Sequence, residues 1–211
     1  MFTDRVEAGR RLGEMLRGTV EPPIRVLGVA RGGVVVAAEV ARALDAELDV
    51  VIPRKLGAPG NPELGIGAVA PGVRVVDRGI MRTLGIDDAY VEAEARRQEA
   101  EIERRTSAYR EGMAPVDLGE AAAVVVDDGV ATGVTAVAAL RWARAQGAAP
   151  VIFAAPVGPA GIERRLAPDC DRCVILVEPD DLRAVGLWYE RFDQTTDEQV
   201  RAALRAARDR A

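Results

Sequence analysis

The sequence contains no histidine, one lysine, two cysteines and few aromatic residues, which make up 4% of its 211 residues. The absence of histidine excludes Ser-His-Asp and Cys-His catalysis. It also means that Cys170 and Cys173, spaced as C-x-x-C, cannot complete a zinc site of four Cys and His ligands within one chain. We expect two thiols at the edge of a strand; a redox pair or half of a zinc site are the alternatives.

The chain also lacks an excess of basic charge and any long apolar run. Its 28 basic and 33 acidic residues give a net charge of −5, so there is no basic footprint for nucleic acid. No run approaches the ~18 apolar residues that span a bilayer. The first residues carry acid early and lack the apolar core of a signal peptide. We therefore expect a cytoplasmic protein with no nucleic-acid partner and no membrane partner.

Five short apolar segments rich in Val and Ile are typical of buried strands. They are Ile24–Ala30, Leu48–Ile52, Ala122–Val126, Val151–Pro156 and Cys173–Val177. Helical patterns follow three of them, at Val34–Leu44, Thr135–Gln146 and Ala160–Leu166. Continuous apolar strands interleaved with helices predict an α/β fold of three layers, with a mostly parallel central sheet of about five strands and helices on both faces.

Further elements flank this core. We expect an amphipathic helix at Asp4–Leu16, a hairpin of Gly67–Val69 with Val73–Asp77, and an exposed, charged helix between Asp87 and Glu111. A capping-box pattern at Thr196 opens a last helix. The length suits one domain, residues 1–211, with a core at about 20–177, a small C-terminal hood at about 178–195 and a C-terminal helix at about 196–209.

The strongest chemical pattern is the segment Ala123–Thr135, Ala-Val-Val-Val-Asp-Asp-Gly-Val-Ala-Thr-Gly-Val-Thr. An apolar strand ends at two acids, Asp127 and Asp128, and small and hydroxyl residues then lead into a helix. A small-residue turn at a helix start exposes backbone N–H groups that suit a phosphate. Carboxylates before it suit the vicinal hydroxyls of a sugar, or a hydrated Mg²⁺. The pattern favours a ribose 5-phosphate site over an ordinary strand–turn–helix with exposed acids.

Two more segments place basic residues after a strand. In Arg31-Gly32-Gly33 the glycines let the backbone approach an anion, and the arginine supplies a fork of charged donors. Arg54 and Lys55 open a Gly/Pro-rich segment, residues 53–67, that we expect to be a loop. Lys55 is the only lysine beside 27 arginines, which favours a need for a compact ammonium there over chance survival.

The segment Ala123–Thr135 resembles the phosphoribosyl diphosphate (PRPP) motif of type I phosphoribosyltransferases, and the element order agrees with that family over nearly the whole chain. The stretches Arg-Lys-x-Gly-Ala-Pro-Gly-Asn-Pro-Glu and Trp-Tyr-Glu-x-Phe are similar to those of a bacterial group in the family whose acceptor is unassigned. The resemblance implies the type I fold and a Mg²⁺-dependent transfer of ribose 5-phosphate from PRPP to a small nitrogenous acceptor. Many relatives form homodimers, to which the charged helix could contribute.

The resemblance also implies roles for particular residues. Catalytic roles fall on Asp127, Asp128 and Lys55. The 5-phosphate is bound by Ala131, Thr132, Gly133, Val134 and Thr135. Pyrophosphate is bound by Ala30, Arg31, Gly32, Gly33, Arg54 and Lys55, with a non-proline cis peptide at Ala30–Arg31. The metal, Mg²⁺, is held by Asp127 and Asp128, directly or through water or the ribose hydroxyls.

Other parts of the chain follow from the same resemblance. The expected loop at 53–67 matches the family's mobile loop, which closes over PRPP. Trp188, Tyr189 and Phe192 belong to a hood that binds the acceptor, where rings could stack; the alternative is that they pack the hood on the core. Ala131 stands where hypoxanthine-guanine enzymes have a third acid, which disfavours 6-oxopurine salvage. The fold also serves sensors that bind PRPP or nucleotides without catalysis, and a hydrolase that splits PRPP is a third hypothesis.

Overall fold

Two sheets of different kinds organise the chain in the computed structural model, which describes residues 1–210. The larger is parallel and has the strand order β2-β1-β6-β7-β8. Its strands are β1 (Ile24–Val29), β2 (Glu47–Val51), β6 (Ala122–Val126), β7 (Val151–Val157) and β8 (Arg172–Val177). These are the five apolar segments of the sequence, so the predicted fold class is confirmed.

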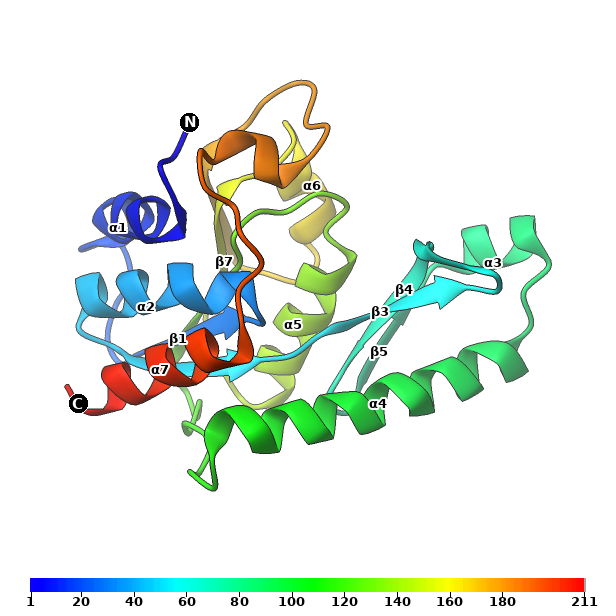
Figure 1. Cartoon of the computed structure of the whole chain (residues 1–211), viewed down its shortest axis with the longest axis horizontal. Helices are drawn as coiled ribbons and strands as arrows, with labels where there is room; N and C mark the ends of the chain where they lie inside the picture. Colours follow the sequence, from blue (N-terminus) through cyan, green and yellow to red (C-terminus); the bar gives the residue numbers. More distant parts are fainter. Residues whose placement is uncertain (211) are drawn as a thin grey trace.

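Alternate residues of the central strands face two separate cores, which is why these strands are apolar throughout. Val26 and Val124 pack with α1 (Arg5–Leu16), α2 (Gly32–Leu44) and α7 (Asp197–Arg208). Leu27 and Val125 pack with α5 (Val134–Ala145) and α6 (Ile162–Leu166) on the opposite face. Figure 1 shows α1, α2 and α7 on one side of the sheet and α5 on the other.

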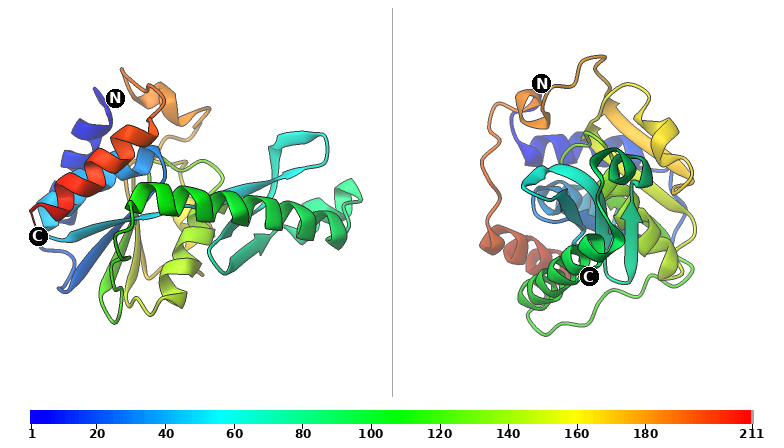
Figure 2. Two further views of the ribbon diagram at one scale, coloured as in Figure 1. Left: turned by 60° about the horizontal axis from the view of Figure 1, so that its bottom comes forward. Right: turned by 90° about the vertical axis from the view of Figure 1, so that its right-hand side faces the viewer.

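The smaller sheet is antiparallel and belongs to an arm that projects from the parallel sheet (Figure 1 and Figure 2). It consists of β3 (Arg54–Ala58), β4 (Asn61–Ala70) and β5 (Val73–Val76), in that order. The arm continues into α3 (Arg78–Leu84) and the long helix α4 (Asp88–Arg110), which runs back beside the strands. The predicted hairpin and the predicted charged helix are both confirmed within it.

The prediction of a loop over residues 53–67 is wrong, because most of that segment is β3 and β4, joined by a turn at Pro59 and Gly60. Apolar side chains explain the difference: Leu56 and Ile66 are fully buried and belong to the same core cluster as Val91 of α4. The two strands are also close, since a Cβ on Gly57 would lie 2.7 Å from the Cα of Pro62. The glycines and prolines therefore permit close strand pairing here.

The hood leads from β8 to α7 and includes a short 3₁₀ helix, η1 (Val185–Trp188). The N-terminal residues pair with it, since Phe2 forms a parallel bridge with Tyr189. The predicted capping box is present at Thr196, whose side chain accepts from the N–H of Gln199. Over the described residues 1–210, none of the helices has the length and apolar character that crossing a membrane requires.

Candidate functional site

Two loops meet at the carboxyl edge of the parallel sheet because they follow the neighbouring strands β1 and β6. Gly32 and Gly33, after β1, lie directly against the acid pair after β6. A Cβ on Gly33 would lie 2.7 Å from the carbonyl oxygen of Val126 and 2.9 Å from the Cα of Asp127. A Cβ on Gly32 would overlap the carboxylate of Asp128. Both motifs found in the sequence therefore form one site, and both need glycine for contact.

The acid pair is held in different ways at its two members. Asp127 is half-buried, and its Oδ1 accepts from the backbone N–H of Asp128 at 2.9 Å. Burial, together with the charge of Asp128, raises the pKa of Asp127 well above its usual value. The Oδ2 of Asp128 accepts from Nε of Arg5 on α1 at 2.7 Å. Arg5 is a site residue that the sequence analysis missed.

The start of α5 offers backbone donors next to the acids. Gly133 precedes the helix in the left-handed region, with φ of 77°, which favours glycine. Among the described residues no side chain caps this helix, so the N–H groups of its first turn face outward with the helix dipole behind them. Ala131 and Thr132 are exposed, and Val134 and Thr135 are half-buried, in the loop and first turn around these donors. The arrangement suits a bound anion.

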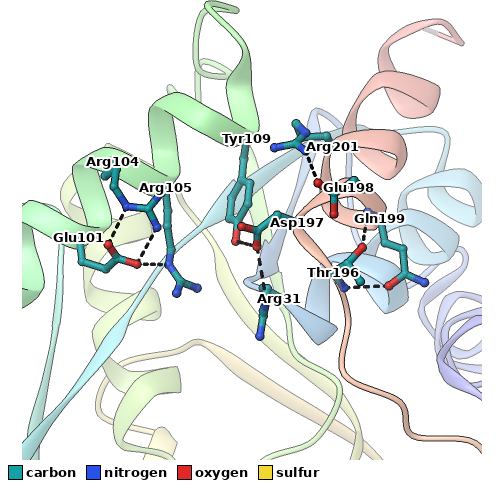
Figure 3. A network of polar contacts seen from close by, with 10 residues as sticks. All are labelled: Arg31, Glu101, Arg104, Arg105, Tyr109, Thr196, Asp197, Glu198, Gln199 and Arg201. Atoms are coloured by element: carbon teal, nitrogen blue, oxygen red, sulfur yellow. Dashed lines mark hydrogen bonds and ion pairs between the residues drawn. The ribbon is translucent and has the colours of Figure 1, made fainter.

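The arginine of the β1 loop points toward the C-terminal helix. The peptide bond between Ala30 and Arg31 is cis, as the resemblance implied. Nη1 of Arg31 lies 3.5 Å from Oδ1 of Asp197 at the start of α7. The hydroxyl of Tyr109, on α4, donates to the same Oδ1 at 2.7 Å. Figure 3 shows Asp197 between Arg31 and Tyr109, so α4 and α7 meet at this loop.

Arg54 and Lys55 leave the same edge of the sheet on β3. Nε of Arg54 donates to Oε1 of Gln98 on α4 at 2.9 Å. Burial, and then the charge of nearby Arg105, lower the pKa of Arg54. Lys55 is exposed, and its side chain lies over Gly65 of β4. The hydrogen bond to Gln98 thus holds Arg54 against α4, whereas Lys55 lies on the surface of the arm.

The hood aromatics contact the core around the acid pair. Tyr189 is buried between Phe2 and Phe192, with ring centroids 5.4 and 4.9 Å away. Its hydroxyl donates to the carbonyl oxygen of Asp128 at 2.6 Å. Arg5 lies over the ring of Phe192, 3.8 Å from its centroid. Tyr189 therefore packs the hood on the core, which is the alternative that the sequence left open for it. Trp188 and Phe192 are half-buried.

Metal binding at this site would depend on the two carboxylates. Within residues 1–210, no group of three or more Cys, Asp and Glu side chains is arranged to hold a metal ion. Mg²⁺ usually keeps several waters and binds one or two carboxylates together with substrate phosphates. Asp127 and Asp128 fit that kind of site. Cys170 is buried and Cys173 half-buried, both as free thiols, and burial raises the pKa of each, of Cys173 to about 12.

A cavity of about 620 Å³ lies elsewhere, between α4 and α5, where its lining includes Ile102 and Trp142. None of the residues that the sequence analysis assigned to the site lines it. This cavity therefore lies apart from the acid pair, the first turn of α5 and the loop after β1.

A parallel α/β sheet with an uncapped helix start and an acid pair at its carboxyl edge is the arrangement with which α/β proteins commonly bind phosphorylated ligands. The comparisons with known proteins are more specific. Residues 5–187 match the family described as "Phosphoribosyl transferase domain", so the chain belongs to this family.

Particular relatives agree with that assignment. The chain is 46% identical over 211 residues to proteins named "Putative phosphoribosyl transferase" from two strains of Mycobacterium tuberculosis, covering 99% of this chain. It spans about half, 48%, of the length of these curated relatives. The crystal structure of TT1426 from Thermus thermophilus is similar as well, with a TM-score of 0.80 and 43% identity over 96% of this chain and 97% of that one.

Three residues near the site, Arg5, Tyr109 and Asp197, were not found from the sequence. Each belongs to a helix that sequence patterns predicted, but its partner lies far along the chain: Arg5 contacts Asp128, 123 positions away, and Tyr109 contacts Asp197, 88 positions away. Arg5 and Tyr109 had no local signal. Asp197 follows the capping-box residue Thr196, which indicated a helix start and nothing about its partner.

Proposed function

We propose that this chain is a PRPP-dependent phosphoribosyltransferase that moves ribose 5-phosphate to a nitrogenous acceptor, releases pyrophosphate and depends on Mg²⁺. The observation that carries the proposal is the contact between Gly32 and Asp128. This contact brings together two loops at one edge of the sheet. We expect the loop after β1 to bind diphosphate and the loop after β6 to bind ribose 5-phosphate. A ligand with phosphate groups at both ends of a sugar matches that pairing.

The 5-phosphate end of PRPP fits the start of α5. Backbone N–H groups of Ala131–Val134 would bind it, and the hydroxyls of Thr132 and Thr135 would add donors. Gly133 is in the left-handed region directly before the helix, so the loop turns there into the first turn that carries these donors. The diphosphate end fits the other loop, where Gly33 lets the backbone approach closely and Arg31 adds charge.

The ribose fits between these ends, over the acid pair. Carboxylates of Asp127 and Asp128 would accept hydrogen bonds from the 2- and 3-hydroxyls, or bind them through the metal. When bound, Mg²⁺ would neutralise charge on the diphosphate. The same carboxylates would favour the positive charge that develops on the ribose ring as the leaving group departs.

The reaction breaks the bond between C1 of the ribose and a diphosphate oxygen, and it forms a bond between C1 and the acceptor nitrogen. The electron pair of the broken bond leaves with pyrophosphate, and the proton of the acceptor nitrogen passes to the departing pyrophosphate or to water. Arg31 would bind the departing anion, and Arg54 and Lys55 would do so from β3. The hood, with Trp188 and Phe192, would hold the acceptor on the opposite side of the ribose.

A second candidate function, a PRPP or nucleotide sensor without catalysis, is favoured by one observation. Leu56 is buried and Tyr90 donates to the carbonyl oxygen of Gly57 at 2.9 Å, so the segment that resembled a closing loop is a hairpin packed on α4. A sensor needs no closure over its ligand. Turnover with an acceptor would exclude this function, whereas PRPP binding alone is compatible with both.

The test is PRPP binding by titration calorimetry, with and without Mg²⁺. We expect metal-dependent binding by the wild type and its loss in the double variant Asp127→Asn/Asp128→Asn. A matched control is Asp180→Asn/Asp181→Asn, which neutralises another pair of adjacent acids, on the exposed part of the hood. If the wild type does not bind millimolar PRPP, or if both double variants bind alike, the proposed function is wrong. Bound PRPP that is hydrolysed without any acceptor would identify a hydrolase.

A further inference from the structure

Three arginines from separate elements lie along α4, and we call them the arginine cluster: Arg31, which shares Asp197 with Tyr109 of α4, Arg54, which donates to Gln98 of α4, and Arg105 on α4 itself. Arg31 precedes α2, Arg54 begins β3, and Arg105 lies on α4. The last of these was assigned no role by the sequence. Its helix carries a polar face toward the cluster, because Glu101, Arg105 and Tyr109 follow one another at intervals of four residues.

Contacts to two carboxylates fix the place of the cluster. Asp197 lies 3.5 Å from Arg31 and accepts from Tyr109 at 2.7 Å. Glu101 accepts from Nε of Arg105 at 2.6 Å, and it is shared with Arg104 at 2.8 Å. Arg105 is held through Nε, and Figure 3 shows its terminal nitrogens directed away from Glu101. Its side chain is 22% exposed, which leaves it accessible to a ligand.

Electrostatic effects agree that the groups are close together. The hydrogen bond from Tyr109, and then the charges of Arg31 and Arg105, lower the pKa of Asp197. The charge of Arg105 lowers the pKa of Arg54, after burial. Three positive charges stand beside two carboxylates, Asp197 and the shared Glu101, so positive charge is in excess here. A multiply charged anion would complement that excess.

We propose that Arg105 is a further binding residue for the diphosphate end of PRPP, next to Arg31. This inference rests on the proposed function. A guanidinium fork matches the oxygens of a diphosphate, and α4 would thereby connect the arm to the reacting end of the ligand. Tyr109 and Asp197 are positioning residues, since they hold Arg31 and the α4 face together without touching the ligand. The ribose 5-phosphate end does not involve Arg105.

The experiment compares three ligands, PRPP, inorganic diphosphate and ribose 5-phosphate, by calorimetry with Mg²⁺. In Arg105→Gln we expect binding of PRPP and of diphosphate to weaken about tenfold or more, as for the loss of a charged hydrogen bond, with ribose 5-phosphate unchanged. Arg105→Lys should retain part of the binding. The matched control is Arg104→Gln, because Arg104 shares the Glu101 partner but its side chain is 62% exposed; this variant should bind all three ligands as the wild type does.

The outcomes separate this inference from the proposed function. If Arg105→Gln binds diphosphate as well as Arg104→Gln does, the inference is overturned while the proposed function stands. If Arg105→Gln weakens ribose 5-phosphate equally, the effect is on the fold and the inference is also overturned. A wild type that binds diphosphate through Arg105 but does not bind PRPP would overturn the proposed function, and with it the assignment of Arg105 to PRPP. A wild type that binds neither would overturn both.

Discussion

Nε of Arg5 lies 2.7 Å from Oδ2 of Asp128, across 123 positions of sequence. The same guanidinium donates to the carbonyl oxygen of Asp193 at 2.8 Å and lies over Phe192. One side chain therefore connects the first helix, the acid pair and the hood. It also places a positive charge near Asp127, where it opposes the rise in the pKa of that carboxyl.

We predict that Arg5→Met weakens PRPP binding several-fold at neutral pH. We also expect binding to be lost at a higher pH on acidification than in the wild type. The charge of Arg5 lowers the pKa of Asp127, so its removal lets that pKa rise further, and Asp127 is then protonated at a higher pH. Calorimetric titrations of PRPP between pH 5 and 9 would measure both effects. Arg10→Met is the control, because Arg10 is on the same helix, its side chain is 58% exposed and it pairs with Glu39 rather than with the acid pair. Identical pH profiles for the two variants would contradict the prediction.

A second prediction concerns stability at the acid pair. The pKa of Asp127 is raised in the folded state, so its protonated form is favoured by folding. The contribution of protonated Asp127 to stability is complete below the ordinary pKa of an unfolded Asp, and it is lost as pH rises through the raised pKa of the folded state. In Asp127→Asn no carboxyl can ionise at this position, so this loss of stability does not occur. We expect the variant to melt at a higher temperature than the wild type at pH 8, by about 2–4 °C per kcal/mol of difference.

The measurement is the melting temperature of both proteins between pH 4 and 8. The difference should shrink as pH falls, because the wild-type carboxyl then becomes neutral like the amide. Asp180→Asn, on the exposed hood surface, should show no such trend. A variant that is less stable than the wild type at pH 8 would mean that ionised Asp127 is stabilised by its surroundings, contrary to the prediction.

The parallel sheet was predictable because its signal is local. Ala122–Val126 is apolar at every position, and it is β6 with the same bounds. The arm was harder, because the residues of β3 that pack, Leu56 among them, stand between glycines and prolines that usually mark loops. Only contact with α4 makes that segment a strand pair, and such contact is absent from a local pattern.

The site residues also divide into those with a local sequence signal and those without one. The acid pair, the start of α5 and the glycines after β1 were found because each lies directly after a strand, where ligands bind in such sheets. Arg5 and Asp197 reach the site from the two ends of the chain, on helices whose patterns indicate only amphipathic packing. Tyr189 was found as an aromatic residue, but its burial depends on Phe2, which precedes it by most of the chain.

Gly32→Ala tests the contact between the two loops. The added methyl group would overlap the carboxylate of Asp128 and lie 2.8 Å from Nε of Arg5. Since Asp128 must move, we expect PRPP binding to fall at least tenfold while the circular dichroism spectrum is unchanged. Gly79→Ala is the control, because Gly79 is exposed at the start of α3 and its Cβ would meet the Asp77 side chain at 3.1 Å. Wild-type affinity in Gly32→Ala would show that the two loops do not act on one ligand.

The last prediction concerns the base of the arm, where Asp49 of β2 is 1% exposed. Its carboxylate accepts from Nη2 of Arg110 at 2.9 Å and from the backbone N–H of Val116 at 3.0 Å. This pair fixes the end of α4 against the sheet edge. Arg110→Met removes one partner and leaves a buried charge, so we expect the free energy of unfolding to fall by about 3–5 kcal/mol in urea titrations.

Two further variants decide whether the buried charge is the cause. In Asp49→Leu/Arg110→Met both charges are gone, and we expect most of the lost stability to return, because a buried pair replaced by apolar side chains is often neutral. Arg183→Met breaks a pair with Asp181 whose two side chains are 78% and 73% exposed, and it should change stability little. A double variant as unstable as Arg110→Met would show instead that the arm depends on the hydrogen bond to Val116 and on side-chain shape rather than on charge pairing.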